Sequence, residues 1–335
     1  DDTIATAELT QLASNFSCEA IVALDGDGED ALEAIVASMK AQALQNWRLS
    51  LVDSGNASRA AREYARHLVR EDARISYRES GIDGFIDAVN AVISESSADW
   101  IALLPSGIIL SPHAVSSVAR AAAHPETRVI YSDDDRIDPE TMQRWNPFFK
   151  PDWSPDLLLS MNYLGPLVVF HRQAVVDVGG LRHGVPGAEV YDLALRVTER
   201  SDYVHHVPDV LATTIATAPG PGESWHASDW QESERQALED ALVRRKVDGF
   251  VERGLHPGTW RVRYALPDPP AVTAVIPTGG KLDMLRPCLA DLLERTDYPN
   301  LEILLVDNSK GGAVECLVKE LSPRFPGLRR LANPL

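Results

Sequence analysis

Three consecutive carboxylates, Asp133, Asp134 and Asp135, are the residues of this sequence whose type and spacing most directly suggest chemistry. They follow Val129–Tyr131, a run of β-branched and aromatic residues that is typical of a buried strand. Open α/β sheets bind their ligands at the carboxyl ends of their strands, so the cluster predicts a ligand site there. The alternative is a solvated turn, because aspartate is a common turn former.

Two further carboxylates, Glu189 and Asp192, lie in the first turn of a predicted amphipathic helix, Glu189–Arg200. Negative side chains suit this end of a helix because the helix dipole is positive there. The sequence therefore leaves two interpretations of this pair open, charge complementarity with the helix and a role in chemistry.

The elements that must position these side chains alternate along the chain. Predicted strands occupy Glu19–Leu24, Arg48–Val52, Arg74–Tyr77, Trp100–Leu104, Pro166–Phe170, Tyr203–Val207, Val210–Ala216 and Thr259–Tyr264. Predicted helices occupy Ala31–Leu44, Ser58–Arg70, Phe85–Ser94, Val115–Ala123 and Ser228–Lys246. Strands that alternate with helices form right-handed βαβ units, so we expect an α/β fold with a mainly parallel, Rossmann-like sheet flanked by helices. No GxGxxG follows the first strand, which argues against a dehydrogenase.

The last part of the chain repeats the first. A Pro-rich linker, 265–271, is followed by a predicted strand, a helix and a second strand that ends at Asp307. The segment LEILLVDNS matches RLSLVDSGN, which lies about 250 residues earlier, so we predict a partial βαβ repeat. We therefore expect a lead-in at 1–18, one domain at 19–264, the linker, and the truncated start of a second domain at 272–335. A sheet of this size buries little surface, so we expect it to be part of a longer chain.

Composition excludes several classes of protein. The net charge of −17 argues against nucleic-acid binding. No apolar run approaches the ~20 residues of a transmembrane helix. The three cysteines show no metal-binding spacing and are consistent with a reducing, cytoplasmic compartment.

Several motifs together resemble bacterial family 2 glycosyltransferases of the tandem-domain type that builds cell-surface polysaccharide. The motifs are YSDDDRID, PFFKPDWSPDLLLSMNYLGPLVVFHR, VGGLR, YDLALRVTER and HHVPDVL, and AVIPT with LVDNS at the start of the repeat. The resemblance implies the GT-A fold and transfer of a sugar from a nucleotide sugar to a glycan hydroxyl. It also implies a cytoplasmic site, peripheral at the inner membrane face. In this family an Asp-rich motif holds Mg²⁺ or Mn²⁺ and a carboxylate acts as general base.

The sequence departs from the family pattern where the chemistry is expected. The segment after the fourth strand, Pro105–Ile108, has no carboxylate, and the position of the family's base is Val190. A His-Trp-Arg-like segment of the family is replaced by Thr213–Ile215. A general base alone contributes ~10²–10⁴-fold to the rate, so these changes predict an eroded first domain.

Two hypotheses follow from the resemblance and the departures. In an active transferase, Asp133 and Asp135 would replace the missing metal ligands, and Glu189 or Asp192 would act as base. Asp53, Asp133, Asp135 and Asp307 would then lie on the nucleotide-donor side. In the alternative, a non-catalytic GT-A module binds glycan or supports an active second domain and needs no cation.

Overall fold

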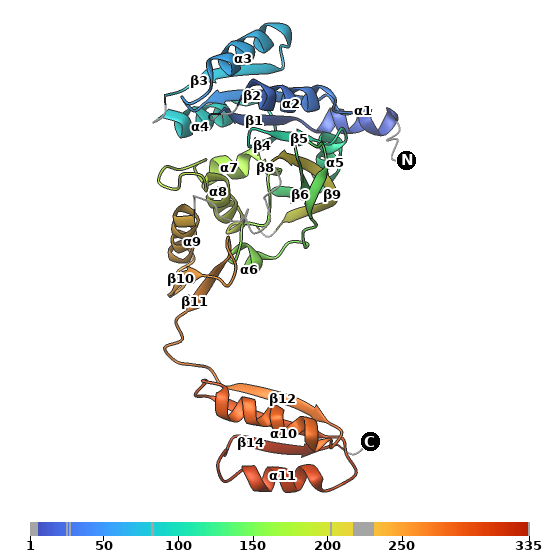
Figure 1. Cartoon of the computed structure of the whole chain (residues 1–335), viewed down its shortest axis with the longest axis vertical. Coiled ribbons are helices and arrows are strands. Elements are labelled where there is room, and N and C mark those ends of the chain that lie inside the picture. Colours follow the sequence, from blue (N-terminus) through green and yellow to red (C-terminus); the bar gives the residue numbers. More distant parts are fainter. Residues whose placement is uncertain are drawn as a thin grey trace. The chain divides into compact units, whose positions relative to one another are not determined.

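The computed structural model describes residues 6–24, 26, 28–81, 84–201, 203–216 and 231–333. The chain forms two compact units that divide between Tyr264 and Ala265 (Figure 1). Each unit has a core of its own and is described by itself. Within the described residues, no helix has the length and apolarity needed to cross a membrane.

The first unit is built of helices and strands in alternation. Its helices are α1 (Thr6–Asn15), α2 (Glu29–Lys40), α3 (Arg59–Glu71), α4 (Phe85–Glu95), α5 (Ala114–Ala121), α6 (Pro155–Leu158), α7 (Arg172–Asp177), α8 (Glu189–Thr198) and α9 (Gln231–Arg244). Its strands are β1 (Cys18–Leu24), β2 (Trp47–Asp53), β3 (Ile75–Glu79), β4 (Trp100–Leu104), β5 (Ile108–Leu110), β6 (Val129–Ile137), β7 (Arg144–Phe148), β8 (Val168–His171), β9 (Val204–Ile215), β10 (Gly249–Arg253) and β11 (Trp260–Tyr264).

The central sheet follows the order β3-β2-β1-β4-β8-β6-β9-β5, and β7 pairs with β6. Strands β3, β2, β1, β4, β6 and β9 run in one direction, whereas β8, β5 and β7 run in the other. The predicted α/β fold with a mainly parallel sheet is therefore confirmed. Strands β10 and β11 form a separate antiparallel hairpin.

Two hydrophobic cores cover the two faces of this sheet. Ala20, Val22 and Leu24 of β1 point to the face that packs on α2 and α3. Ile21, between them, points to the opposite face, which α4 and α8 cover. Successive residues of a strand face opposite sides, and both sides are buried here, which explains the nearly continuous apolar sequence of β1.

Several elements differ from the sequence-based expectation. Strand β6 continues through the three aspartates to Ile137, because β9 and β7 pair with it there. The aspartates therefore lie within a strand and not in a turn after it. The two strands predicted in 203–216 are one strand, β9, with register shifts beside Ser132 and Asp133. The expected helix 228–246 is described from Gln231 onward, and its first three residues lie outside the described part.

The second unit contains β12 (Val272–Thr278), α10 (Leu282–Ala290), the short π-helix η2 (Asp291–Arg295), β13 (Leu301–Asp307), α11 (Ala313–Leu321) and β14 (Leu328–Ala332). The three strands form a parallel sheet in the order β12-β13-β14. The predicted partial βαβ repeat is therefore confirmed, and the second crossover helix extends it by one strand.

Candidate functional site

Asp53 is the last residue of β2, and it organises the loop that leaves this strand. The residue is 1% exposed. One of its oxygens, Oδ1, accepts a hydrogen bond of 2.8 Å from the backbone N–H of Gly55. The other, Oδ2, lies 2.6 Å from Nε of Arg62 on α3 and 3.1 Å from the hydroxyl of Tyr77 on β3. Gly55 has φ +95°, which a residue without a Cβ adopts readily.

The electrostatics of Asp53 follow from these contacts. Burial by itself raises the pKa of this carboxyl, but the hydrogen bonds from Arg62, from the loop N–H groups and from Tyr77 outweigh it and leave the pKa below 3.8. Asp53 is therefore an ionised carboxylate whose oxygens already have cationic and neutral donors. Its contacts hold the strand end in place, and the predicted role in nucleotide binding stays a prediction.

Asp133 is buried within β6, beside His206, a histidine that no sequence motif placed in a site. Its Oδ1 accepts hydrogen bonds from the backbone N–H of Lys150, at 2.9 Å, and lies 2.8 Å from Nε2 of His206 on β9. The His206 ring stacks on Tyr131, with ring centroids 4.8 Å apart. Asp133 is 3% exposed, so it faces a packed interior and not an open cleft.

Asp134 forms an ion pair with a buried lysine. Its Oδ2 lies 2.6 Å from Nζ of Lys150, whose side chain is 0% exposed. Nζ of Lys150 also donates hydrogen bonds to the backbone carbonyls of Ser132 and Leu164. Burial raises the pKa of Asp134 and lowers the pKa of Lys150, since both charges are largely withdrawn from water. The lysine lies beneath Gly165, where a Cβ would collide with Nζ.

Asp135 is held from two sides. Its Oδ2 lies 2.8 Å from Nη1 of Arg144 on β7, and its Oδ1 accepts a hydrogen bond of 2.7 Å from the hydroxyl of Thr213 on β9. Thr213 stands in the segment where the family pattern has a His-Trp-Arg-like sequence. In this chain the segment serves to fix a carboxylate of the neighbouring strand.

These contacts test whether Asp133 and Asp135 suit a divalent cation. A hard cation needs several carboxylate or carbonyl oxygens that are free to converge on it. Here Oδ1 of Asp133 lies against the backbone N–H of Lys150 and against His206, and the two oxygens of Asp135 lie against Arg144 and Thr213. No group of three or more His, Cys, Asp or Glu side chains placed to hold a metal ion occurs among the residues that the structure describes. The aspartates therefore do not fit the predicted metal site, because hydrogen-bond donors and the Arg144 guanidinium already occupy positions that a metal would take.

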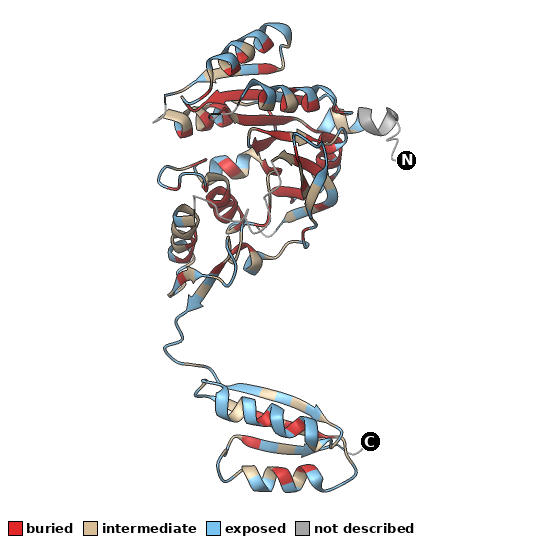
Figure 2. Cartoon of the chain, viewed as in Figure 1, coloured by how far each residue is buried: buried red, intermediate tan, exposed pale blue. Residues whose placement is uncertain are grey.

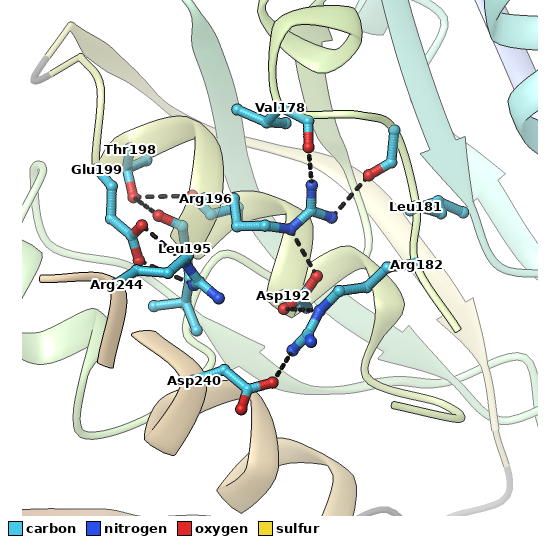
Figure 3. Close-up of polar contacts among 12 residues, drawn as sticks. Val178, Leu181, Arg182, Asp192, Leu195, Arg196, Thr198, Glu199, Asp240 and Arg244 are labelled. Carbon is cyan, nitrogen blue, oxygen red and sulfur yellow. Dashed lines mark hydrogen bonds and ion pairs between the residues drawn. The ribbon is translucent and has the colours of Figure 1, made fainter. Parts of the chain in front are cut away.

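Asp192 lies in the first turn of α8 and is fully buried between two arginines (Figure 3). Nε of Arg182 lies 2.7 Å from Oδ1, and Nε of Arg196 lies 2.8 Å from Oδ2. Arg182 also reaches Asp240 of α9, at 2.5 Å. An enclosed carboxylate with a cation on each oxygen has no path to an acceptor hydroxyl. The geometry of Asp192 therefore favours a structural ion pair over the predicted role as base.

The same network fixes the loop before α8. Arg196 donates hydrogen bonds to the backbone carbonyls of Val178, at 2.8 Å, and Gly180, at 2.7 Å (Figure 3). Gly179 and Gly180 have φ +85° and +72°, so the double glycine allows the sharp turn that presents these carbonyls. The VGGLR and YDLALR motifs are thus two halves of one buried structure that joins the loop to α8.

Glu189 differs from Asp192 because it borders an open pocket. The pocket is lined by Phe85, Ile86, Arg182, His183, Gly184, Pro186 and Glu189. Its volume of 410 Å³ falls in the range of about 300–1,000 Å³ that small-molecule sites occupy. Glu189 is half-buried at the start of α8, and Val190 follows it. Of the two predicted candidates for the base, Glu189 is the one that the structure places at a cavity.

Asp307 occupies in the second unit the place that Asp53 has in the first. It is the last residue of β13 and is 0% exposed. Its Oδ2 lies 2.8 Å from Nε of Arg330 on β14, and Ser309 donates to Oδ1 from its backbone, at 2.9 Å. Hydrogen bonds from Ser309 and Arg330 lower the pKa of Asp307, although burial opposes them. Its predicted role on the donor side of the second unit stays a prediction.

Many partners in these networks were not assigned to a site from the sequence. Among them are Arg182, Lys150, Tyr77 and His206. Arg182 lies in the VGGLR motif and Lys150 in PFFKPDW, so motif context offered a signal for both. Tyr77 and His206 are brought to their aspartates by strand pairing, β2 with β3 and β6 with β9, which no local pattern contains.

The sheet order and the strand directions define an α/β domain with a mainly parallel sheet. Comparison with known proteins agrees. Residues 20–179 match the family described as glycosyl transferase family 2. The first 349 residues of TarS from S. aureus align with a TM-score of 0.51 at 10% identity, covering 68% of this chain and 64% of that one. GalNAc-T7 with UDP, GalNAc and Mn²⁺ aligns with a TM-score of 0.54 at 12% identity, covering 67% and 48%. At these identities the two structures establish the fold alone.

Two relatives extend the likeness over most of the chain. An uncharacterized protein, y4gI, of Sinorhizobium fredii is 34% identical over 310 residues, and the O-antigen biosynthesis protein RfbC of Myxococcus xanthus is 31% identical over 310 residues. The matches cover 91% and 89% of this chain but only 34% and 24% of those proteins. The chain thus spans about a third and a quarter of the length of these relatives. The first unit thus contains a segment, residues 20–179, that matches glycosyl transferase family 2, and the unit has the GT-A fold.

Proposed function

We propose that the first unit transfers a sugar from a nucleotide-sugar donor to a hydroxyl of a glycan acceptor during synthesis of a surface polysaccharide. The proposal extends the family membership of residues 20–179 to this chain's own activity. The name of the Myxococcus xanthus relative, an O-antigen biosynthesis protein, supports the choice of acceptor class. We place the reaction in the cytoplasm, at the inner face of the membrane where such a glycan would be assembled.

The observation that carries the proposal is the pocket at the start of α8. Glu189 borders it, and the buried Asp192 network fixes the helix that holds Glu189. In the proposed reaction the Glu189 carboxylate takes the proton of the acceptor hydroxyl. The hydroxyl oxygen attacks the anomeric carbon of the donor, a new glycosidic bond forms, and the bond to the nucleoside diphosphate breaks. A positioned base of this kind contributes ~10²–10⁴-fold to the rate.

We propose that this unit acts without a cation held by Asp133 and Asp135. Both carboxylates are buried and engaged by Lys150, His206, Arg144 and Thr213, as described above. Structures of related fold contain Mn²⁺ and nucleotide sugars, but those groups belong to those proteins. In this chain we assign the aspartates of β6 a structural role, and Asp53 an indirect one in shaping the donor side through the loop after β2.

The test is transfer by the purified chain from radiolabelled UDP-, GDP- and dTDP-sugars to lipid-linked glycan extracted from the source cells. We expect Glu189→Gln to lower kcat by about 10²-fold or more with little change in KM, as expected for the loss of a base. Glu63→Gln, which removes an exposed ion pair on α3, serves as the control and should keep full activity.

Two outcomes separate the proposal from the alternative module. Activity that persists in EDTA agrees with a reaction that does not depend on Asp133 and Asp135 as metal ligands. Glycan binding by calorimetry without transfer from any donor would reject the enzyme and favour a non-catalytic module. Unchanged kcat in the Glu189→Gln variant would reject Glu189 as the base.

A further inference from the structure

The hairpin of β10 and β11 packs on α9 by one of its faces. Val251 and Trp260 are buried in the same cluster as Ala237 and Leu238 of α9. The indole N–H of Trp260 also donates a hydrogen bond of 3.2 Å to Glu234 of α9. Successive residues of a strand point to opposite sides, so the residues next to these point away from α9. Figure 2 shows the result as pale blue, exposed residues along β11.

The outward face of the hairpin combines an aromatic side chain with two arginines. Phe250 lies opposite Arg263 in the register of the strands, and Glu252 lies opposite Arg261. Phe250 is 59% exposed. The Glu252 carboxylate lies 2.6 Å from Nε of Arg263 and 3.8 Å from Nε of Arg261. One carboxylate balances the charge of one guanidinium, so this face keeps an excess of positive charge.

The turn that joins the two strands holds a leucine out in solvent. The backbone N–H of Gly254 donates to the carbonyl of Thr259, at 2.9 Å, and the Thr259 hydroxyl donates to the carbonyl of His256, at 2.7 Å. Gly258 has φ +72°, which suits a residue without a Cβ. Leu255 is 97% exposed, the highest value of any large apolar side chain among the described residues. The hydrogen bonds of the turn therefore fix an apolar side chain at the tip of the hairpin.

The charge of the hairpin is opposite to that of the chain. The full sequence has a net charge of −17, whereas residues 249–264 contain three arginines and a single acidic residue. An anionic surface repels the chain as a whole, so a locally basic part must lead the approach to it. Attraction of arginine to an anionic bilayer acts within a Debye length, about 8 Å at physiological ionic strength. The hairpin is thus suited to face such a surface.

We propose that the β10–β11 hairpin docks the first unit on a bilayer of anionic phospholipids. Leu255 and Phe250 enter the headgroup region, and Arg261 and Arg263 face the phosphates. A bilayer is favoured over a protein partner because the apolar part is one protruding side chain and one ring, whereas stable protein interfaces bury about 1,200–2,000 Å². It is favoured over a hydrated polyanion because leucine gains free energy only by leaving water for an apolar medium.

Docking of this kind is reversible, since a small apolar insertion and a few basic residues each bind a membrane weakly. The inference gives the proposed membrane location a surface on the molecule. It rests on that part of the proposed function and not on catalysis by Glu189.

The test is flotation of the full chain with lipid vesicles, in the absence of nucleotide sugar and acceptor. Vesicles of equal parts phosphatidylcholine and phosphatidylglycerol are compared with vesicles of phosphatidylcholine alone. We expect the partition coefficient to be about tenfold higher or more for the anionic vesicles. It should fall in about 1 M salt, where the Debye length is about 3 Å.

Two variants of the hairpin separate its apolar and basic parts. Leu255→Ser should lower the partition coefficient for the anionic vesicles by about tenfold, because the leucine side chain no longer leaves water. Arg261→Gln combined with Arg263→Gln should lower it by about tenfold as well. The comparison of the two kinds of vesicle uses the wild type alone, so it stands even if a variant fails to fold.

Matched controls remove the same kinds of groups elsewhere in the chain. Met284→Ser changes an apolar side chain of α10 that is 69% exposed. Arg59→Gln combined with Arg70→Gln removes two exposed charges from α3. Both controls should bind the anionic vesicles as the wild type does.

The inference would be overturned by equal partition into both kinds of vesicle, by no partition into either, or by equal binding of the hairpin variants and the controls. Self-association that Leu255→Ser abolishes, without vesicle binding, would assign the tip to a contact between copies and would also overturn it. Because neither donor nor acceptor is present, these outcomes are distinct from a failure of the proposed transfer by Glu189.

Discussion

Glu189 and Asp192 lie three residues apart at the start of one helix, and their surroundings give them different chemistry. Asp192 points into the interior, where Arg182 and Arg196 each bind one of its oxygens. Glu189 borders a pocket that a small molecule can enter. The sequence offers two acidic side chains in a first turn, and burial decides which of them can meet a substrate.

Removal of the Asp192 charge should strongly lower the free energy of unfolding. We expect Asp192→Asn to lower the free energy of unfolding by about 3–5 kcal/mol, because it leaves a buried arginine without its partner. Urea unfolding at pH 7 measures the change. Glu63→Gln, which breaks an exposed ion pair on α3, should cost less than about 1 kcal/mol. Equal effects of the two substitutions would argue against the structural role of Asp192.

Asp53 should give the protein a pH dependence at acid pH. Its pKa in the folded chain is below the ordinary value of 3.8, so its ionised form stabilises the fold. This contribution is fully present above about pH 4 and is lost as the pH falls through the lowered pKa. The difference in unfolding free energy between the wild type and Asp53→Asn should therefore shrink as the pH falls below about 4. A difference that stays constant over this range would contradict the assignment.

Pairing with its neighbouring strands sets the length of β6. A run of three aspartates favours a turn, but pairing with β9 and β7 extends the strand through them. Each carboxylate is then matched by a donor from a neighbouring segment, Lys150, Arg144 or Thr213. Local preference predicted an exposed site there, and the strand pairing produced a buried polar layer instead.

The turn before β8 depends on a glycine for space. Gly165 has φ +79°, and a Cβ there would collide with Nζ of Lys150 and lie 2.6 Å from Oδ2 of Asp134. We expect Gly165→Ala to cost about 3–5 kcal/mol in urea unfolding, because the buried ion pair must separate. At Gly184, with φ +94° and nothing within 4 Å, the same change should cost only about 1–2 kcal/mol from backbone strain. A smaller loss at Gly165 than at Gly184 would contradict this account.

The two units of the whole molecule differ in size and in the extent of their cores. The second unit buries one small cluster, Leu285, Leu289, Ile303, Leu305, Val314, Leu317 and Leu328. Smaller domains bury a lower fraction of their surface and are less stable. All seven tryptophans precede residue 265, so tryptophan fluorescence reports on the first unit alone.

Because all tryptophans lie in the first unit, two optical probes can distinguish the unfolding of the two units. In urea, we expect the far-ultraviolet circular dichroism to lose part of its helical signal before tryptophan fluorescence changes, because α10 and α11 unfold with the smaller unit. The first step should have the smaller dependence on urea concentration, since it exposes less surface. Superimposable transitions by the two probes would contradict the expectation that the smaller unit unfolds first.

Alternating apolar strands and amphipathic helices were sufficient to predict the α/β fold and the repeat of the βαβ unit, because those patterns record which faces are buried. The motifs from 129 to 211 were sufficient to predict the family. The partners of each carboxylate depend on residues brought together by strand pairing, such as Tyr77 beside Asp53 and His206 beside Asp133. Only the tertiary structure decided which acidic residues lie at a pocket and which are neutralised in the interior, because burial and charge pairing are properties of the assembled sheet and not of the local sequence.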